Sequence, residues 1–117
     1  MMIRDVKRGE IYQVDWSPAR GSEQAGRRPA LVIQNDTGNK FSPITIVASC
    51  STVAEKSYPF LVPIKAKESG LRKDCAVNLA SIMSIEKTRL GDKCGMLNQD
   101  KMAEVDKAIK HSLGIDG

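Results

Sequence analysis

Two adjacent arginines stand where a polar segment runs into an apolar one. Residues 21–29 read Gly-Ser-Glu-Gln-Ala-Gly-Arg-Arg-Pro, and the apolar residues 30–33 follow directly. Because Pro29 fixes the backbone where a strand begins, a loop here can present side chains at a rigid edge. The guanidinium groups of Arg27 and Arg28 match the geometry of phosphate oxygens. This segment therefore predicts chemistry on a phosphate.

Hydroxyl side chains at the end of the β-branched segment 44–49 form the second candidate element. Ser49, Ser51 and Thr52 could donate hydrogen bonds to a phosphate whose developing charge Arg28 neutralises. The alternative is that these hydroxyls bond to their own backbone at the end of a strand. Both interpretations place these hydroxyls at the end of a strand.

Other familiar reactive groups are absent from the sequence. It contains no P-loop, GxGxxG or HExxH motif, and its His, Cys, Asp and Glu residues are not grouped at metal-ligand spacing. His111 lies in the last turn of a predicted helix, where a cation is favourable. We therefore expect no metal and no cofactor, and we do not expect a histidine-dependent nuclease.

The three cysteines, Cys50, Cys75 and Cys94, lie too far apart in sequence for a CxxC motif. Their odd number argues against a disulfide framework, so we expect reduced, semi-buried thiols. No stretch approaches the roughly 18 apolar residues of a membrane span, and the amino terminus lacks the apolar region of a leader. We expect a cytoplasmic protein without a membrane partner.

Composition and charge favour one globular domain with a polyanionic partner. The 117 residues are 41% hydrophobic and 27% charged, which is ordinary for a folded domain, and the net charge is +4. No repeat or linker divides the chain, so we expect a single domain over residues 1–117. The basic side chains of interest gather in three predicted loops, at Arg20, Arg27 and Arg28, at Arg72 and Lys73, and at Lys56.

The elements that must position these groups are mostly strands. Alternating or β-branched patterns predict strands at 10–16, 28–35, 44–49, 58–64 and 75–79, with turns expected at 35–36 and 38–39. Six or seven short strands without long helices between them favour a small barrel.

The carboxyl-terminal segment has the pattern of a helix. Asn98 can cap its start and Gly114 its end, while acidic residues precede basic ones along it. One apolar stripe predicts its packing face on the barrel, at Met102, Val105, Ile109 and Leu113.

Several of these motifs occur together in a known family. The string at 21–29, the Lys-Phe-Ser-Pro of 40–43 and the segments 74–79 and 87–90 resemble the MazF/PemK family of toxin endoribonucleases over nearly the whole chain. The resemblance implies a mainly β fold with α, an SH3-like small barrel of the CcdB/PemK kind with a carboxyl-terminal helix. It also implies a homodimer that cuts single-stranded RNA, chiefly mRNA, at short sequences without a metal.

The resemblance also implies roles for individual residues. The family's catalytic arginine, which precedes the proline of the second strand, falls on Arg28. Its catalytic threonine falls on Ser51, which keeps the hydroxyl but lacks the methyl group that restricts χ1; Thr52 is the alternative if the loop is displaced by one residue. The expected RNA-binding residues are Arg20, Ser22, Glu23, Gln24, Arg27, Thr52 and Lys56.

The implied reaction is in-line attack by a ribose 2′-hydroxyl on its own phosphodiester, which leaves a 2′,3′-cyclic phosphate and a 5′-hydroxyl. Glu23 is the nearest candidate base, and it is equally well explained as a solvated loop carboxylate. Where relatives commonly read Glu-Gln-Ile-Arg-Thr-Ile, residues 80–85 read Ala-Ser-Ile-Met-Ser-Ile. The family's cleavage-site preference is therefore not carried over.

Partners follow from the same resemblance. We expect a cognate MazE-like antitoxin whose acidic, initially disordered segment covers the basic groove, with operator DNA bound through the toxin–antitoxin complex. Two alternatives from other classes remain. One is a non-enzymatic CcdB-like toxin that binds DNA gyrase, and the other is an RNA-binding module without turnover.

Overall fold

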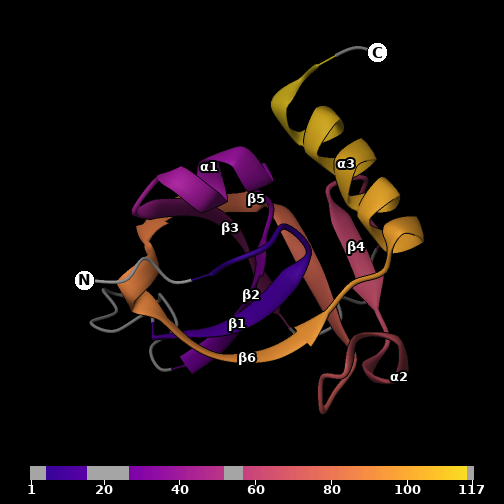
Figure 1. Cartoon of the computed structure of the whole chain (residues 1–117). Helices are drawn as coiled ribbons and strands as arrows, with labels where there is room; N and C mark the ends of the chain where they lie inside the picture. The colour runs from indigo at the N-terminus through magenta and orange to yellow at the C-terminus, as the bar shows by residue number, and fades with distance from the viewer. Residues whose placement is uncertain (1–4, 16–26, 52–56, 116–117) are drawn as a thin grey trace, which may run out of the picture.

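Six antiparallel strands form one strongly curved sheet, in the order β4-β5-β3-β2-β1-β6 (Figure 1). The computed structural model describes residues 5–15, 27–51 and 57–115. The strands are β1 (Glu10–Asp15), β2 (Arg27–Val32), β3 (Ile44–Ser51), β4 (Leu61–Ile64), β5 (Cys75–Glu86) and β6 (Leu90–Met96). The helices are α1 (Asp36–Phe41), α2 (Ala66–Ser69) and α3 (Gln99–Leu113), with a 3₁₀ turn, η1 (Lys87–Arg89), between β5 and β6.

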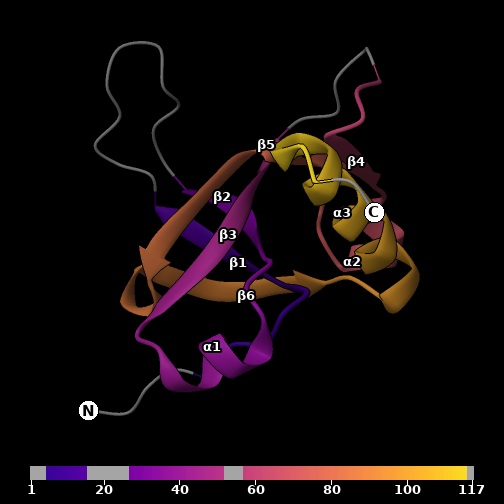
Figure 2. The ribbon, with the colours of Figure 1, turned by 90° about the horizontal axis from the view of Figure 1, so that it is seen from above.

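The sheet bends sharply along β5. Ser49 of β3 pairs with Asn78, whereas the preceding Ala48 pairs with Ile82, so residues 79–81 form a bulge in β5. Bulges bend and twist the strand that contains them. The first part of β5 pairs with both β3 and β4, while the remainder continues beside β3 alone. This bend carries β4 and α3 to one side of the sheet, as the view from above shows (Figure 2).

The described strands do not close into a barrel. β4 and β6 are the two ends of the sheet order, and no pairing among the described residues joins them. The mainly β architecture with helices agrees with expectation, whereas the closed SH3-like barrel is not confirmed. None of the helices in the described ranges is both long and apolar enough to cross a lipid bilayer.

Apolar side chains are buried on both faces of the sheet. One core contains Leu31 and Ala48 together with Val105 and Ala108 of α3. The other lies on the opposite face of the same strands and is enclosed by the curvature of the sheet. Its members are Val6, Tyr12, Val14, Ala30, Val32, Val47, Ile85 and Leu90. The central strands are therefore covered on both sides, and β1, expected to be half-buried, is buried over most of its length.

Helix α3 begins and ends where its caps predict. The Asn98 side chain accepts a hydrogen bond from the Lys101 amide at 2.8 Å, and Gly114 ends the helix with a φ of 72°. Val105 is fully buried, as its stripe predicts. Leu113 is instead 59% exposed, because the helix extends past the sheet at its carboxyl end.

The turns expected at 35–36 and 38–39 are wrong, because helix α1 occupies this segment. Asn35 caps it by accepting a hydrogen bond from the Gly38 amide at 2.8 Å. Asn39 is buried, and its side chain accepts a hydrogen bond from Thr45 Oγ1 at 2.7 Å. The buried Lys87 Nζ donates to the Asn39 carbonyl. Contacts from distant segments therefore hold this short helix.

Strand ends also differ from expectation, because pairing partners decide them. β2 ends at Val32 instead of residue 35, β3 continues to Ser51, β4 begins at Leu61 instead of residue 58, and β5 continues to Glu86. β6 had no strand pattern of its own, since residues 90–96 read Leu-Gly-Asp-Lys-Cys-Gly-Met. It forms because it pairs with the open edge of β1.

Candidate functional site

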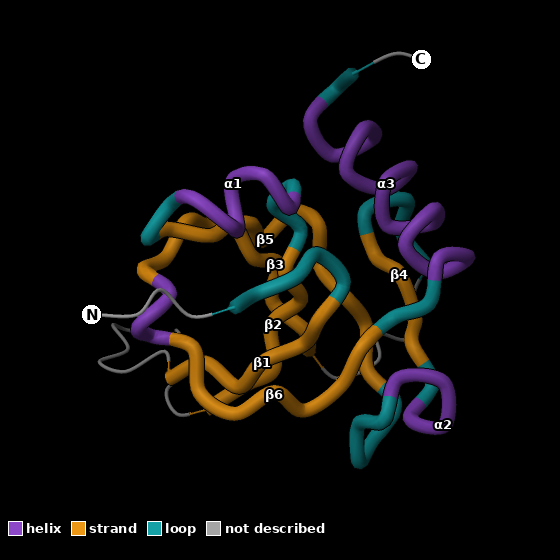
Figure 3. The backbone as a smooth tube through the Cα atoms, viewed as in Figure 1, coloured by secondary structure: helices purple, strands orange, loops and turns teal. Residues whose placement is uncertain are grey.

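A cleft of about 860 Å³ opens at the end of the sheet where β2 and β3 meet the segment between α2 and β5. Figure 3 shows α2 and the loop after it below β4. The cleft is lined by residues 27–29 of β2, 50–51 of β3 and 70–75, together with Gln13, Asp92 and Cys94. Five separate parts of the chain therefore contribute to one opening.

Arg28 and Ser51 stand just beyond the paired part of β2 and β3. The β2–β3 ladder runs from Val32–Val47 to Ala30–Ser49, and each of the two residues lies two positions past the last pair on its own strand. The regular ladder stops before this point because Pro29 has no amide hydrogen to donate. Both side chains line the cleft and are half-buried. The structure thus brings together the two groups that the sequence nominated for catalysis.

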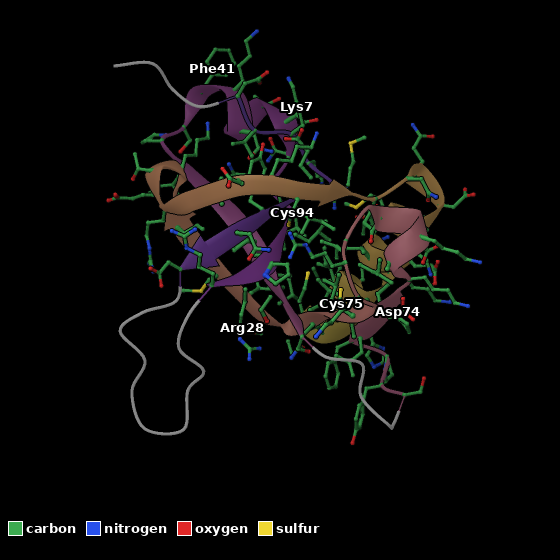
Figure 4. All side chains as sticks on the ribbon, turned by 90° about the horizontal axis from the view of Figure 1, so that it is seen from below. Lys7, Arg28, Phe41, Asp74, Cys75 and Cys94 are labelled. Atoms are coloured by element: carbon green, nitrogen blue, oxygen red, sulfur yellow. The ribbon has the colours of Figure 1, made fainter. Side chains whose placement is uncertain are left out.

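The two arginines lie within β2 and not in the loop before it. Arg27 pairs with Asp15 and Arg28 with Val14 of β1, so both backbones are held by the sheet. Arg27 is exposed, and the Arg28 side chain extends outward from the ribbon (Figure 4). A strand position holds a side chain more rigidly than a loop does. This placement is suited to preorganised charge stabilisation.

Ser51 occupies a similarly fixed position. It is the last residue of β3 and pairs with Ala76 of β5, so a neighbouring strand restrains its backbone. The other residues expected to contact RNA lie outside the described residues. These are Arg20, Ser22, Glu23, Gln24, Thr52 and Lys56.

The opposite wall of the cleft is a segment that sequence reasoning did not include in the site. Arg72 and Lys73 lie between α2 and β5, are exposed, and line the same cleft as Arg28. The segment is held in place because Asp74 Oδ1 accepts a hydrogen bond from the Ala66 amide at 2.7 Å. The sequence showed a basic pair in a predicted loop. No local pattern indicated that this loop would line the same cleft as Arg28.

The cleft carries a net positive charge. Four cationic side chains, Arg27, Arg28, Arg72 and Lys73, outnumber the two carboxylates of Asp74 and Asp92, which gives a balance of +2. The salt bridges found among the described residues involve none of these four cations. Such an opening attracts a polyanion, and its arginines can bind phosphate oxygens in the bidentate manner.

Three free thiols form part of the cleft lining. Cys50 and Cys75 are buried, and Cys94 is partly exposed, as expected for reduced cysteines. A hydrogen bond with Cys75 and burial raise the pKa of Cys50 well above its usual value. The same hydrogen bond lowers the pKa of Cys75, while burial raises the pKa of Cys94. Sequence spacing gave no indication that the three thiols converge.

Within the described ranges, no group of three His, Cys, Asp or Glu side chains is arranged to hold a metal ion. His111 is exposed on the last turn of α3 and does not line the cleft. The chemistry that these residues support is therefore the binding of an anion by arginines, with a hydroxyl beside it.

Known proteins share both the sequence pattern and the fold. Residues 7–113 match the PemK-like, MazF-like toxins of type II toxin–antitoxin systems. Endoribonuclease MazF of Staphylococcus epidermidis is 45% identical to this chain over 112 residues, which cover 95% of this chain and 93% of that protein.

Two solved structures extend the comparison. An endoribonuclease from mycobacterial species has a TM-score of 0.82 at 20% identity, over 100% of this chain and 99% of that one, which is a likeness of fold. MazF in a MazE–MazF structure (Form-II) from Deinococcus radiodurans has a TM-score of 0.77 at 25% identity, over 97% of this chain and 99% of that one. Since the family match spans nearly the whole chain and a relative is 45% identical, the chain belongs to the PemK/MazF family of type II toxin–antitoxin toxins.

Proposed function

We propose that this protein is a sequence-specific endoribonuclease that cuts single-stranded RNA, chiefly mRNA, in the cleft at the start of β2 and the end of β3. The observation that carries this proposal is that Arg28 and Ser51 line one cleft of positive charge. The 45% identity to a protein named Endoribonuclease MazF supports it. The same match supports RNA cleavage over gyrase binding of the CcdB kind.

The proposed mechanism needs positioning and charge stabilisation from the protein. A ribose 2′-hydroxyl attacks the adjacent phosphorus in line with the departing 5′-oxygen, which leaves a 2′,3′-cyclic phosphate and a 5′-hydroxyl. Arg28 donates hydrogen bonds to the phosphorane, whose negative charge exceeds that of the substrate. Ser51 orients a phosphate oxygen or assists proton transfer. No step requires a metal, because the substrate supplies its own nucleophile.

The surrounding residues bind the RNA on either side of the cut. Arg27 contacts a flanking phosphate, and Arg72 and Lys73 contact the strand from the opposite wall of the cleft. Arg20, Ser22, Glu23, Gln24, Thr52 and Lys56 complete the RNA-binding surface from the segments on either side of β2 and β3. Glu23 is the candidate general base.

We further infer how the toxin is assembled and controlled. The chain forms one domain over residues 1–117, curved in the manner of an SH3-like barrel, and acts in the cytoplasm as a homodimer. A MazE-like antitoxin covers the cleft with an acidic segment, and the complex binds operator DNA. The structure of MazF with MazE in Deinococcus radiodurans supports an antitoxin partner.

Incubation of the purified protein with single-stranded RNA in EDTA tests the proposed function. Endonucleolytic fragments with cyclic-phosphate ends are expected. RNA retained intact in a complex would indicate a binding module without turnover, and no interaction with RNA would favour the gyrase-binding alternative.

Replacement of Ser51 by alanine is expected to lower RNA cleavage about tenfold or more, because one hydrogen-bond donor at the reacting phosphate is removed. Cys50→Ala provides the matched control, since it alters a neighbouring residue that the mechanism does not use, and Thr52→Ala tests the alternative position of the hydroxyl. Initial rates on a fluorogenic RNA, with circular dichroism to verify folding, make the comparison. A larger loss in Thr52→Ala than in Ser51→Ala would move the catalytic hydroxyl by one residue.

Removal of the opposite basic wall is expected to weaken RNA binding without abolishing the chemistry. In the double variant Arg72→Ala/Lys73→Ala, the slope of log affinity against log salt falls by about 0.7 for each phosphate that the protein no longer neutralises. The double variant Lys67→Ala/Lys107→Ala is the control, because it removes the same charge from exposed positions outside the cleft. Equal slopes in the two double variants would place the RNA elsewhere.

A further inference from the structure

Two of the cleft thiols form a pair that the cleavage mechanism does not use. Cys50 of β3 and Cys75 of β5 belong to one core cluster and come from neighbouring strands of the sheet. Cys50 lies opposite Val77, so Cys75, two residues from Val77, faces the same side of the sheet. Their exposed fractions are 2% and 7%, and both line the cleft. The two sulfurs are therefore adjacent at a place that small solutes reach from the cleft.

The pair is polarised, with one reactive and one protected thiol. The hydrogen bond with Cys50 lowers the pKa of Cys75, although burial and the Asp74 carboxylate oppose the shift. The pKa of Cys50 is raised by the same hydrogen bond and by burial. Cys75 is also the more exposed of the two, at 7% against 2%, so it meets an oxidant first, and the deeper Cys50 then reacts with the oxidised sulfur.

We propose that Cys50 and Cys75 form a peroxide-sensitive thiol pair that closes to a disulfide and thereby lowers RNA cleavage. The Cys75 thiolate attacks one oxygen of hydrogen peroxide and breaks the O–O bond, which gives a sulfenic acid and, after protonation, water. The Cys50 sulfur then attacks the Cys75 sulfur, its proton is lost, and the sulfenic hydroxyl leaves as a second water. The two thiols together lose two electrons, and these electrons reduce one hydrogen peroxide to two waters.

The bond changes the site because its two ends adjoin catalytic and binding residues. Cys50 precedes Ser51, and Cys75 follows the segment that carries Arg72 and Lys73. A disulfide holds its sulfurs about 2.05 Å apart, much closer than a hydrogen-bonded pair. Since Cys75 is diagonal to Cys50 and not opposite it, closure draws the ends of β3 and β5 together. This moves Ser51 relative to Arg28. The effect on cleavage rests on the proposed function, whereas the bond itself does not.

The chain allows direct mapping of the bond. Cleavage after lysine and arginine places each cysteine in its own peptide, with Cys50 in 41–56, Cys75 in 74–87 and Cys94 in 94–101. The full-length reduced protein is treated with hydrogen peroxide, its remaining thiols are alkylated, and the digest is analysed by mass spectrometry. The expected product links 41–56 to 74–87, leaves 94–101 alkylated and disappears after treatment with dithiothreitol.

Cleavage by the same samples is measured in parallel. Peroxide is expected to lower the rate by about tenfold to a hundredfold, since a displacement near 1 Å in a catalytic site has effects on that scale. Dithiothreitol restores the rate. Cys50→Ala and Cys75→Ala lose this response, whereas Cys94→Ser, which alters the third thiol of the cleft, retains it. Because methionines also react with peroxide, Cys50→Ala shows any inactivation that is independent of the pair.

Several results would overturn the proposal. The first two are a disulfide that involves Cys94 and oxidation of Cys75 without a linked peptide. The others are a linked protein that cleaves RNA as fast as the dithiol form or faster, and a Cys50→Ala variant that peroxide inactivates as much as the wild type. A reduced protein that cleaves no RNA would contradict the proposed function instead, while the peptide map would still decide whether the thiol pair closes.

Discussion

Replacement of Arg28 by alanine is expected to lower RNA cleavage about 10²-fold or more, the scale of losing one transition-state donor. Arg28 and Ser51 line one cleft of positive charge, and the guanidinium of Arg28 is the cation that the proposed mechanism assigns to the phosphorane. The loss is expected in kcat more than in KM, because other cations remain to bind the RNA. Single-turnover cleavage of a fluorogenic RNA measures it.

Two variants make this result specific. Arg28→Lys keeps the charge but loses the planar fork of donors, so a rate between those of the wild type and Arg28→Ala is expected. Arg89→Ala removes an exposed arginine outside the cleft and is expected to retain most of the activity. Circular dichroism establishes that each variant is folded. A folded Arg28→Ala variant with nearly normal turnover would remove Arg28 from the mechanism.

A single 2′-deoxy nucleotide on the 5′ side of the scissile phosphate is expected to abolish cleavage while leaving binding nearly unchanged. The proposed reaction uses the 2′-hydroxyl as its nucleophile, and the deoxy sugar lacks it. The phosphates that the arginines bind are still present. Gel analysis of a chimeric oligonucleotide measures cleavage, and fluorescence anisotropy measures binding.

The matched control is an oligonucleotide with the deoxy nucleotide on the 3′ side of the same phosphate, which is expected to be cut. The all-RNA parent is expected to be cut equally well in EDTA and in added Mg²⁺. Cleavage of the first chimera, or a requirement for Mg²⁺, would point to an activated water and reject the proposed mechanism.

The sequence by itself determined the features that depend on near neighbours. The bounds of α3 follow from Asn98 and Gly114, because caps act within one helical turn. The central parts of β1 to β4 and the first part of β5 follow from alternating, apolar or β-branched residues. Arg28 and Ser51 were identified from their motifs, and both line the same cleft. Their roles in catalysis stay a prediction.

Only the tertiary structure decided which distant segments meet. The loop with Arg72 and Lys73 and the three thiols line the same cleft as Arg28, although these segments are far apart in the sequence. The buried Lys87 holds α1 through the carbonyl of Asn39, which is far from it in sequence. Strand ends, bulges and loop contacts depend on partners many residues away. Local propensity therefore could not specify the second wall of the cleft or the thiol pair within it.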